Sequence, residues 1–176
     1  MSSQKGMRLV IDASLATSCG ERGERGKMCQ DFLICMLEET SFEVVITKEI
    51  GIEWDHHSHQ IAREWRKSMN ARRRVSRPKV EADEILRKKI RQSTSATKTL
   101  SEMEHDYHLI EAARTTDKRV VALDDKARGY FTSASNFVGE LREIVWVNPT
   151  KAEEDAIIWL RSGIPAEVAR QLRLSI

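Results

Sequence analysis

The stretch Leu9-Val10-Ile11-Asp12 is a short apolar run that leads directly into an aspartate, and Val120-Val121-Ala122-Leu123-Asp124 repeats this pattern. Continuous β-branched runs of this length are typical of strands buried on both faces of a parallel sheet. In an open α/β sheet the ligand crevice lies at the carboxyl ends of the strands, which is where we expect both carboxylates. Gathered carboxylates repel one another unless a cation joins them, so the pattern indicates a site for a hard divalent metal ion.

Further apolar runs alternate with helical patterns along the chain. Strands are expected at 8–12, 43–47, 120–124 and 144–147, and helices at 27–39, 48–69, from about 80 onward, and 101–115. The polar stretch after residue 12, with three glycines, is predicted as a loop. Strands that alternate with helices predict an α/β protein, arranged as a three-layer α/β/α fold with a mainly parallel central sheet. We expect one domain over 1–148, with a basic helical insertion at about 69–98, and a C-terminal helical extension over 149–176.

The composition is that of an ordinary globular protein with a polar surface: 40% of the residues are hydrophobic, 32% are charged, and the net charge is +2. Between residues 63 and 91, however, twelve Lys or Arg face only four Asp or Glu, which hints at a polyanionic partner. Cys19, Cys29 and Cys35 form no CxxC pair and are predicted as reduced thiols, with Cys35 in the core. No apolar run approaches the ~20 residues needed to cross a bilayer, so we expect a cytoplasmic protein.

Asp106 is the third informative acid. It falls on the apolar stripe of the predicted helix 101–115, together with Met103, Ile110 and Ala113. An ionised carboxylate in apolar surroundings is costly unless it is paired or metal-bound. Asp106 is therefore interpreted as a ligand, against the alternative of a helix-start residue that bonds backbone amides.

The fourth acid is either Glu49 or Glu53. The apolar stripe of the predicted helix 48–69 is formed by Ile50, Trp54, Ile61 and Trp65. At 100° per residue, Glu53 lies roughly 90° from the centre of this stripe and Glu49 about 130° from it. Glu49 also falls in the first helical turn, where a negative charge suits the macrodipole without any function. We favour Glu53, with Glu49 as the alternative.

Several neighbouring residues are candidates for supporting roles. Asp125 adjoins Asp124, so one of the two is a ligand and the other a cap for the following helix, with Asp124 preferred because it is nearer the strand. Ser14 and Thr47 stand at strand ends, where a hydroxyl can bond a metal-bound water or orient Asp12. Each of the two hydroxyls is equally well explained as a plain N-cap.

The histidines are weighed in the same way. His105 and His108 flank Asp106 and would either assist the site or contact a phosphate, although helix-surface positions are the simpler interpretation. The three histidines within 56–59 are predicted at the surface, because adjacent helical side chains point about 100° apart and do not converge on one metal ion. Trp54 and Trp65 have the spacing of core residues.

Basic residues are the candidates for nucleic-acid contacts. They are Arg72, Arg73, Arg74 and Arg77 in the basic stretch, and Arg128 soon after Asp124. Lys and Arg contacts to phosphates supply affinity without sequence selectivity. For the basic stretch, an ordinary solvated face is an equally good interpretation.

The sequence as a whole resembles the PIN-domain nucleases, the fold of many VapC-like ribonuclease toxins in prokaryotic toxin–antitoxin pairs. The resemblance covers about residues 7–147 and rests on four segments: IDAS (11–14), VVITKEIGIEW (44–54), HDYHLIEAA (105–113) and VVALDD (120–125). Family members usually have an Asp at the end of the first strand, then a strand, a Ser or Thr and a helix bearing an acid. A helix-borne Asp and an acid after the next strand follow. Asp12, Thr47, Glu53, Asp106 and Asp124 match these positions.

The resemblance implies a metal-dependent endonuclease. Asp12, Glu53, Asp106 and Asp124 would hold one or two Mg²⁺ or Mn²⁺ ions for phosphodiester hydrolysis. RNA is the expected substrate, with DNA as the alternative. An antitoxin or other protein partner, and a homodimer, are further expectations of the resemblance.

One position departs from the family pattern. The family often has Thr or Ser and then Gly before the last Asp, where this chain has Ala122 and Leu123. This departure motivates an alternative hypothesis, a catalytically weak or inactive PIN-fold module that binds nucleic acid. A phosphohydrolase of another α/β family, with Asp12 as the nucleophile, is disfavoured because Ser14 occupies the place of the second acid that such enzymes carry.

Overall fold

The computed structural model describes residues 6–174, and within them five strands form one parallel sheet. The strands are β1 (Arg8–Ile11), β2 (Glu43–Val45), β3 (Val75–Ser76), β4 (Arg119–Val121) and β5 (Val145–Val147). Their order across the sheet is β3-β2-β1-β4-β5, with every neighbouring pair parallel. The predicted α/β class with a parallel central sheet is therefore confirmed. The carboxyl ends of all these strands meet at one edge of the sheet.

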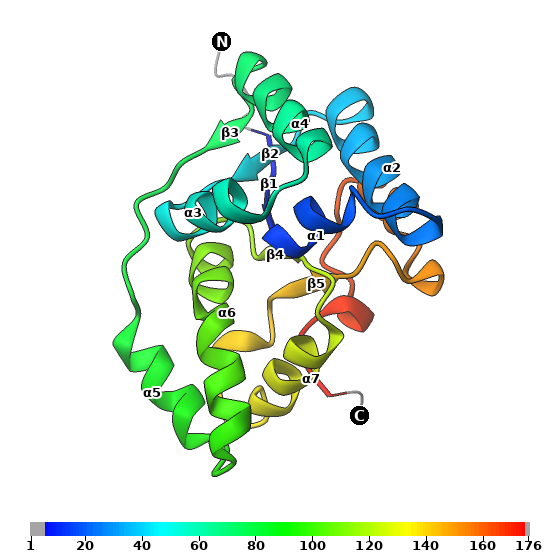
Figure 1. Cartoon of the computed structure of the whole chain (residues 1–176). Helices are drawn as coiled ribbons and strands as arrows, with labels where there is room; N and C mark the ends of the chain where they lie inside the picture. The colour runs from blue at the N-terminus through cyan, green and yellow to red at the C-terminus, as the bar shows by residue number, and fades with distance from the viewer. Residues whose placement is uncertain (1–5, 175–176) are drawn as a thin grey trace.

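Eight α-helices surround this sheet within residues 6–174. They are α1 (Ala13–Ser18), α2 (Glu24–Glu39), α3 (Lys48–His57), α4 (Gln60–Ala71), α5 (Glu84–Gln92), α6 (Thr97–Thr115), α7 (Asp125–Ala134) and α8 (Ala156–Arg161). Helix α6 packs against β1, β4 and α7, whereas α2 packs against α4 and α8 (Figure 1). This arrangement is compatible with a three-layer α/β/α fold.

The two central strands follow from the apolar runs that predict them. Leu9, Val10 and Ile11 are fully buried, as are Val120 and Val121 of the neighbouring strand. Strands that are covered by helices on both faces have no solvent-facing positions, which is why these runs are continuous rather than alternating.

The single helix predicted at 48–69 is wrong, because the chain breaks at Ser58 and His59. The Ser58 backbone N–H closes α3 on the Trp54 carbonyl at 3.0 Å, and the His59 ring accepts the Ile61 N–H to begin α4. The break changes the helical phase, so Ile61 is 40% exposed instead of lying on the apolar stripe. The prediction for the two tryptophans is confirmed: Trp54 and Trp65 are buried and stack with ring centroids 5.9 Å apart.

Two other elements were not predicted. The stretch interpreted as a loop after residue 12 contains α1, whose first N–H groups are capped by Asp12. The basic region contains the short edge strand β3, which pairs with β2 through Val75 and Ser76. Helix α5 of the same region buries Leu86 and Ile90 in the core, so the region is packed into the rest of the protein.

The C-terminal segment is only partly helical. After α8 the chain forms a 3-10 turn at Val168–Arg170 and returns to β5, where the Leu172 N–H bonds the Ile144 carbonyl at 2.9 Å. The last two residues of the predicted extension, 175 and 176, lie outside the described residues. All three cysteines are buried free thiols, whereas the sequence predicted burial only for Cys35. Between residues 6 and 174 no helix has the length and apolarity that a membrane crossing requires.

Candidate metal centre

Asp12 lies where β1 ends and α1 begins, at the carboxyl edge of the sheet. Its backbone is extended, and its Oδ2 atom accepts the Ser14 N–H at 3.2 Å as the N-cap of α1. This cap orients one carboxylate oxygen toward the helix. The side chain remains half-buried at the sheet edge.

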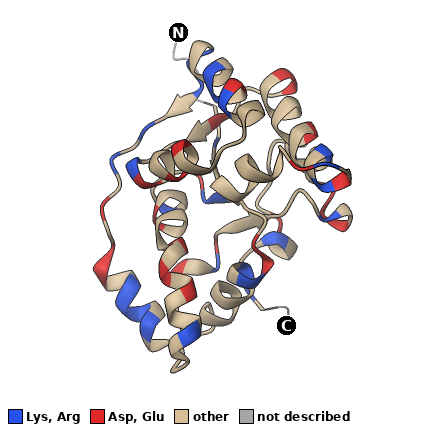
Figure 2. Cartoon of the chain, in the orientation of Figure 1, with Lys and Arg blue, Asp and Glu red and all other residues tan. Residues whose placement is uncertain are grey.

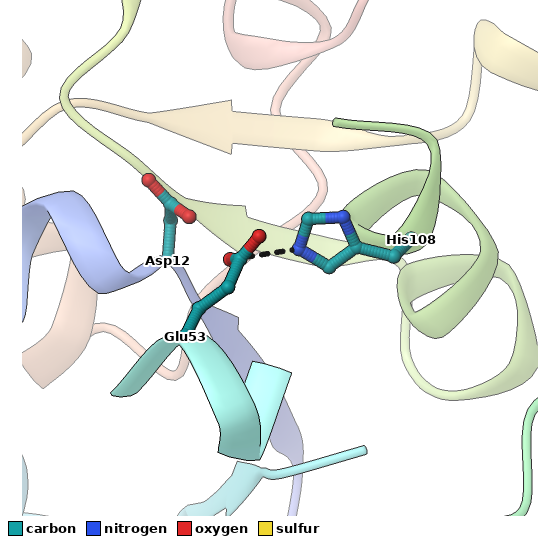
Figure 3. A group of neighbouring side chains, drawn as sticks. All are labelled: Asp12, Glu53 and His108. Atoms are coloured by element: carbon teal, nitrogen blue, oxygen red, sulfur yellow. Dashed lines mark hydrogen bonds and ion pairs between the residues drawn. The ribbon is translucent and has the colours of Figure 1, made fainter. Parts of the chain in front are cut away.

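Glu53 on α3 and His108 on α6 converge on Asp12 (Figure 3). One ligand atom from each of the three residues lies within 4.8 Å of the others. The His108 Nε2 atom is 3.1 Å from the Glu53 Oε2 atom, and the His108 side chain is only 12% exposed. Two carboxylates and an imidazole at this spacing can hold one metal ion.

Asp106 and Asp124, the other two predicted ligands, are not part of this trio; they line a cavity of about 340 Å³, and Asp106 is close enough to Asp12 and Glu53 to feel their charges. Asp124 is the N-cap of α7, where its Oδ1 atom accepts the Ala127 N–H at 2.8 Å. The same cavity is lined by Lys126 and Tyr130, with the Lys126 Nζ atom 5.7 Å from the centre of the Tyr130 ring. A cation and an aromatic ring therefore lie next to two of the predicted acids.

Burial, and then the carboxylates of Asp12, Asp124 and Glu53, raise the pKa of Asp106 from 3.8 to about 7. Each of these three neighbours is near enough to disfavour a charge on Asp106. Asp106 is thus electrostatically coupled to the other three acids predicted from the sequence. Such coupling is expected where carboxylates are gathered for a cation, since a bound cation removes their mutual repulsion.

The structure assigns local roles to the supporting candidates. Thr47 caps α3 by accepting the Ile50 N–H at 3.2 Å, and Ser14 accepts the Leu123 N–H at 3.2 Å. The predicted division of Asp124 as ligand and Asp125 as cap is wrong in its second half, because Asp124 itself caps α7, whereas Asp125 lies in the first turn of α7 and pairs with Lys151 at 3.5 Å. Ser14 is therefore the candidate that connects the strand ends of the site, whereas Thr47 has the N-cap role that the sequence also allowed.

Of the two alternatives on α3, the structure places Glu53 in the trio, and Glu49 lies exposed in the first turn. His108 was weighed from the sequence, but a helix-surface position was the simpler interpretation, and this is wrong. His108 is enclosed because α6 packs against α3 as well as against the sheet. No pattern local to residues 105–113 identifies that contact.

Four of the five predicted nucleic-acid contacts bond other groups of the protein, and Arg77 does so only through the Asn70 amide oxygen at 3.2 Å. Arg72 donates to the Leu37 carbonyl at 2.7 Å, and Arg74 donates to the Met36 carbonyl at 2.7 Å, so both cap the C-terminus of α2. Arg128 pairs with the buried carboxylate of Glu154 at 2.5 Å. Arg73 and Arg77 are exposed.

Comparisons of this chain with protein-family models, with curated proteins and with solved structures found no match in any of the three. A functional conclusion for this chain therefore rests on its fold and on the geometry of the candidate metal centre.

Proposed function

We propose that this protein is a divalent-metal-dependent endonuclease of the PIN type that hydrolyses phosphodiester bonds, with RNA as its substrate. The observation that carries the proposal is the convergence of Asp12, Glu53 and His108, with Asp106 and Asp124 beside them. The acids come from the end of β1, from α3, from α6 and from the N-cap of α7. This order is the one that the sequence resemblance implies.

Mg²⁺ or Mn²⁺ fits the chemistry of these side chains. Carboxylate oxygens are the ligands that both ions prefer, and Asp12 and Glu53 would supply them from one side of the site. A metal ion bound there supplies a Lewis acid for the phosphoryl oxygen and for an attacking water. Asp106 would bind and release a proton near neutral pH, since its pKa is about 7 without a cation.

The test is cleavage of defined RNA transcripts by the purified protein with Mg²⁺, with Mn²⁺ and with a chelator. Asp12→Asn and Glu53→Gln are expected to lower the rate by more than the roughly 10–100-fold that indirect changes around a metal typically cost. Asp125→Asn and Glu49→Gln are matched controls, because each removes an exposed acid close in sequence to a proposed ligand. Both controls should cleave like the wild type.

Wild-type cleavage by both Asp12→Asn and Glu53→Gln, with folding verified by circular dichroism, would overturn the proposal. Salt-sensitive RNA binding without metal-dependent turnover would identify a nucleic-acid-binding module instead. The same assay with single-stranded and duplex DNA separates the two substrate classes.

A further inference from the structure

A second cavity, of about 470 Å³, opens at the carboxyl ends of β2 and β3. Ile46 and Thr47, which follow β2, line one side, and Arg77 and Pro78, which follow β3, line another. Its volume is within the range of small-molecule sites. We call this cavity the basic pocket.

Positive charge dominates the lining of the basic pocket. The four cations are Lys48, Arg66, Arg77 and Lys79, against a single acid, Asp55. Figure 2 shows Lys and Arg on the first part of the extended segment between β3 and α5 and acidic residues after them; Arg77 and Lys79 of the first part line the pocket. Arg66 and Lys79 are neutralised by ion pairs with Asp55 and with Glu81, at 2.5 and 3.2 Å. Of the described residues that line the pocket, Lys48 and Arg77 are left to repel each other, and an anion bound between them would relieve that repulsion.

The charges within the pocket are only partly neutralised. Arg66 pairs with Asp55 at 2.5 Å and lies over the Trp54 ring at 6.0 Å, so its guanidinium is held in place. Among residues 6–174, neither Lys48 nor Arg77 forms an ion pair with a carboxylate. The Arg77 guanidinium donates only to the amide oxygen of Asn70, at 3.2 Å.

Neither of these two cations has a structural explanation in helix electrostatics. Lys48 lies in the first turn of α3, where a positive charge is disfavoured by the helix dipole. Arg77 lies in an extended segment, outside any helix. A ligand that carries negative charge accounts for both.

Apolar side chains complete the pocket. Ile46 and Pro78 contribute to its walls, and Ile52 is 49% exposed although it is a large hydrophobic residue. A ligand with a charged group and an apolar, planar part matches this division. We propose that the basic pocket binds a nucleotide unit, with its phosphate between Lys48 and Arg77 and its base against Ile52.

The position of the basic pocket relates it to the metal centre. Lys48, Ile52 and Asp55 lie on one face of α3, and Glu53 lies roughly 130° from the centre of that face at 100° per residue. Both sites are at the same sheet edge, separated by one helix about 10 Å across. That a single RNA strand contacts both sites at once is an idea that rests on the proposed endonuclease function. Phosphate binding in the basic pocket does not depend on that function.

The experiment is calorimetric titration of the full chain in a chelator, so that no divalent ion contributes. The probes are adenosine, adenosine 5′-monophosphate and a single-stranded oligoadenylate. Adenosine 5′-monophosphate should bind at least about tenfold more tightly than adenosine, since charge-assisted contacts to a phosphate are the stronger ones. Lys48→Ala and Arg77→Ala should each abolish most of that difference, whereas Lys88→Ala, which removes an exposed lysine on α5, should not.

The oligoadenylate shows whether the bound phosphate belongs to a nucleic-acid strand or to a free mononucleotide. Tighter binding of the oligoadenylate, with a salt dependence that falls by about 0.7 in log–log slope for each cation removed, assigns the pocket to a nucleic-acid strand. Equal binding of both phosphorylated probes assigns it to free mononucleotides. Equal affinity for adenosine and its monophosphate, or insensitivity to both pocket variants, would overturn the inference. Because the titration contains no metal and no cleavage, it succeeds or fails independently of the nuclease proposal, and repeating it with Asp12→Asn verifies this.

Discussion

The Ser14 hydroxyl accepts a hydrogen bond from the Leu123 backbone N–H at 3.2 Å and so joins two strand ends that are 109 residues apart in the chain. Ser14 comes two residues after Asp12, and Leu123 directly precedes Asp124. This contact, together with the hydrogen bond from the Asp12 N–H to the Val121 carbonyl at 2.9 Å, holds together the two segments that carry these carboxylates of the proposed metal centre.

Replacing Ser14 by Ala should leave the Leu123 N–H, in a residue that is 7% exposed, without its partner. An unsatisfied buried donor costs about 1–3 kcal/mol, so urea unfolding should show a loss of that order. Mn²⁺ affinity, measured by calorimetry, should also fall, because Asp124 is then held less firmly relative to Asp12. Ser133→Ala, at an exposed serine on α7, is the control and should change neither quantity. Unchanged metal affinity in a destabilised Ser14→Ala protein would limit this contact to a purely structural role.

His108 should set the metal preference of the site. Imidazole nitrogen is a poor ligand for Mg²⁺ and a better one for transition metals, and the His108 Nε2 atom belongs to the trio with Asp12 and Glu53. His108→Gln should therefore lower the affinity for Mn²⁺ more than the affinity for Mg²⁺. His56→Gln, which changes an exposed histidine on α3 that lines neither cavity, should lower neither. Equal losses for the two ions would instead assign His108 to orienting Glu53 through their 3.1 Å contact.

Asp106 should make the stability of the metal-free protein depend on pH. Its pKa is raised from 3.8 to about 7, so between these values the folded state binds more protons than the unfolded state. Stability therefore falls as the pH rises from about 4 to about 7, and the contribution is absent below 4, where both states are protonated. Asp106→Asn removes this penalty, so the variant should melt at a higher temperature than the wild type at pH 8 and show no such gain at pH 4. The check is a series of thermal melts in a chelator, and a pH-independent difference between the two proteins would contradict it.

Adding Mg²⁺ should stabilise the wild type more at pH 8 than at pH 5, because only the ionised carboxylates bind the cation. Asp12→Asn should reduce this stabilisation.

Arg74 should contribute to the free energy of unfolding of the protein. Its guanidinium donates to the Met36 and Leu37 carbonyls at the C-terminal end of α2 and to the Phe42 carbonyl just before β2, at 2.7–2.9 Å. Arg74→Lys removes the planar fork that spans these acceptors and should cost about 1–3 kcal/mol in urea unfolding. Arg73→Lys is the matched control at the adjacent exposed arginine and should be neutral. If Arg74→Lys folds with unchanged stability but binds RNA with a different affinity, Arg74 is a nucleic-acid contact, as the sequence predicts, and this prediction fails.

The helices show where sequence reasoning was limited. The spacing of Trp54 and Trp65 correctly predicts that both are buried, yet the chain turns between them at Ser58 and His59. The turn is stabilised by contacts with a distant segment: the His59 N–H bonds the Ala16 carbonyl at 3.0 Å, and the Thr17 hydroxyl bonds the His57 carbonyl at 2.9 Å. Since those partners belong to α1, no periodicity within 48–69 indicates the break.

By itself, the sequence determined the parallel sheet and the gathering of acids at its edge. Apolar runs such as Leu9–Ile11 specify strands covered on both faces, and residues that directly follow parallel strands share one edge whatever the details of packing. Tertiary structure alone decided that His108 joins Asp12 and Glu53, and that Arg72, Arg74 and Arg128 bond the protein itself. The physical reason is the distance along the chain over which each feature is determined. The burial of a strand is encoded within a few consecutive residues, whereas the partner of a long polar side chain depends on which distant segments the fold brings beside it.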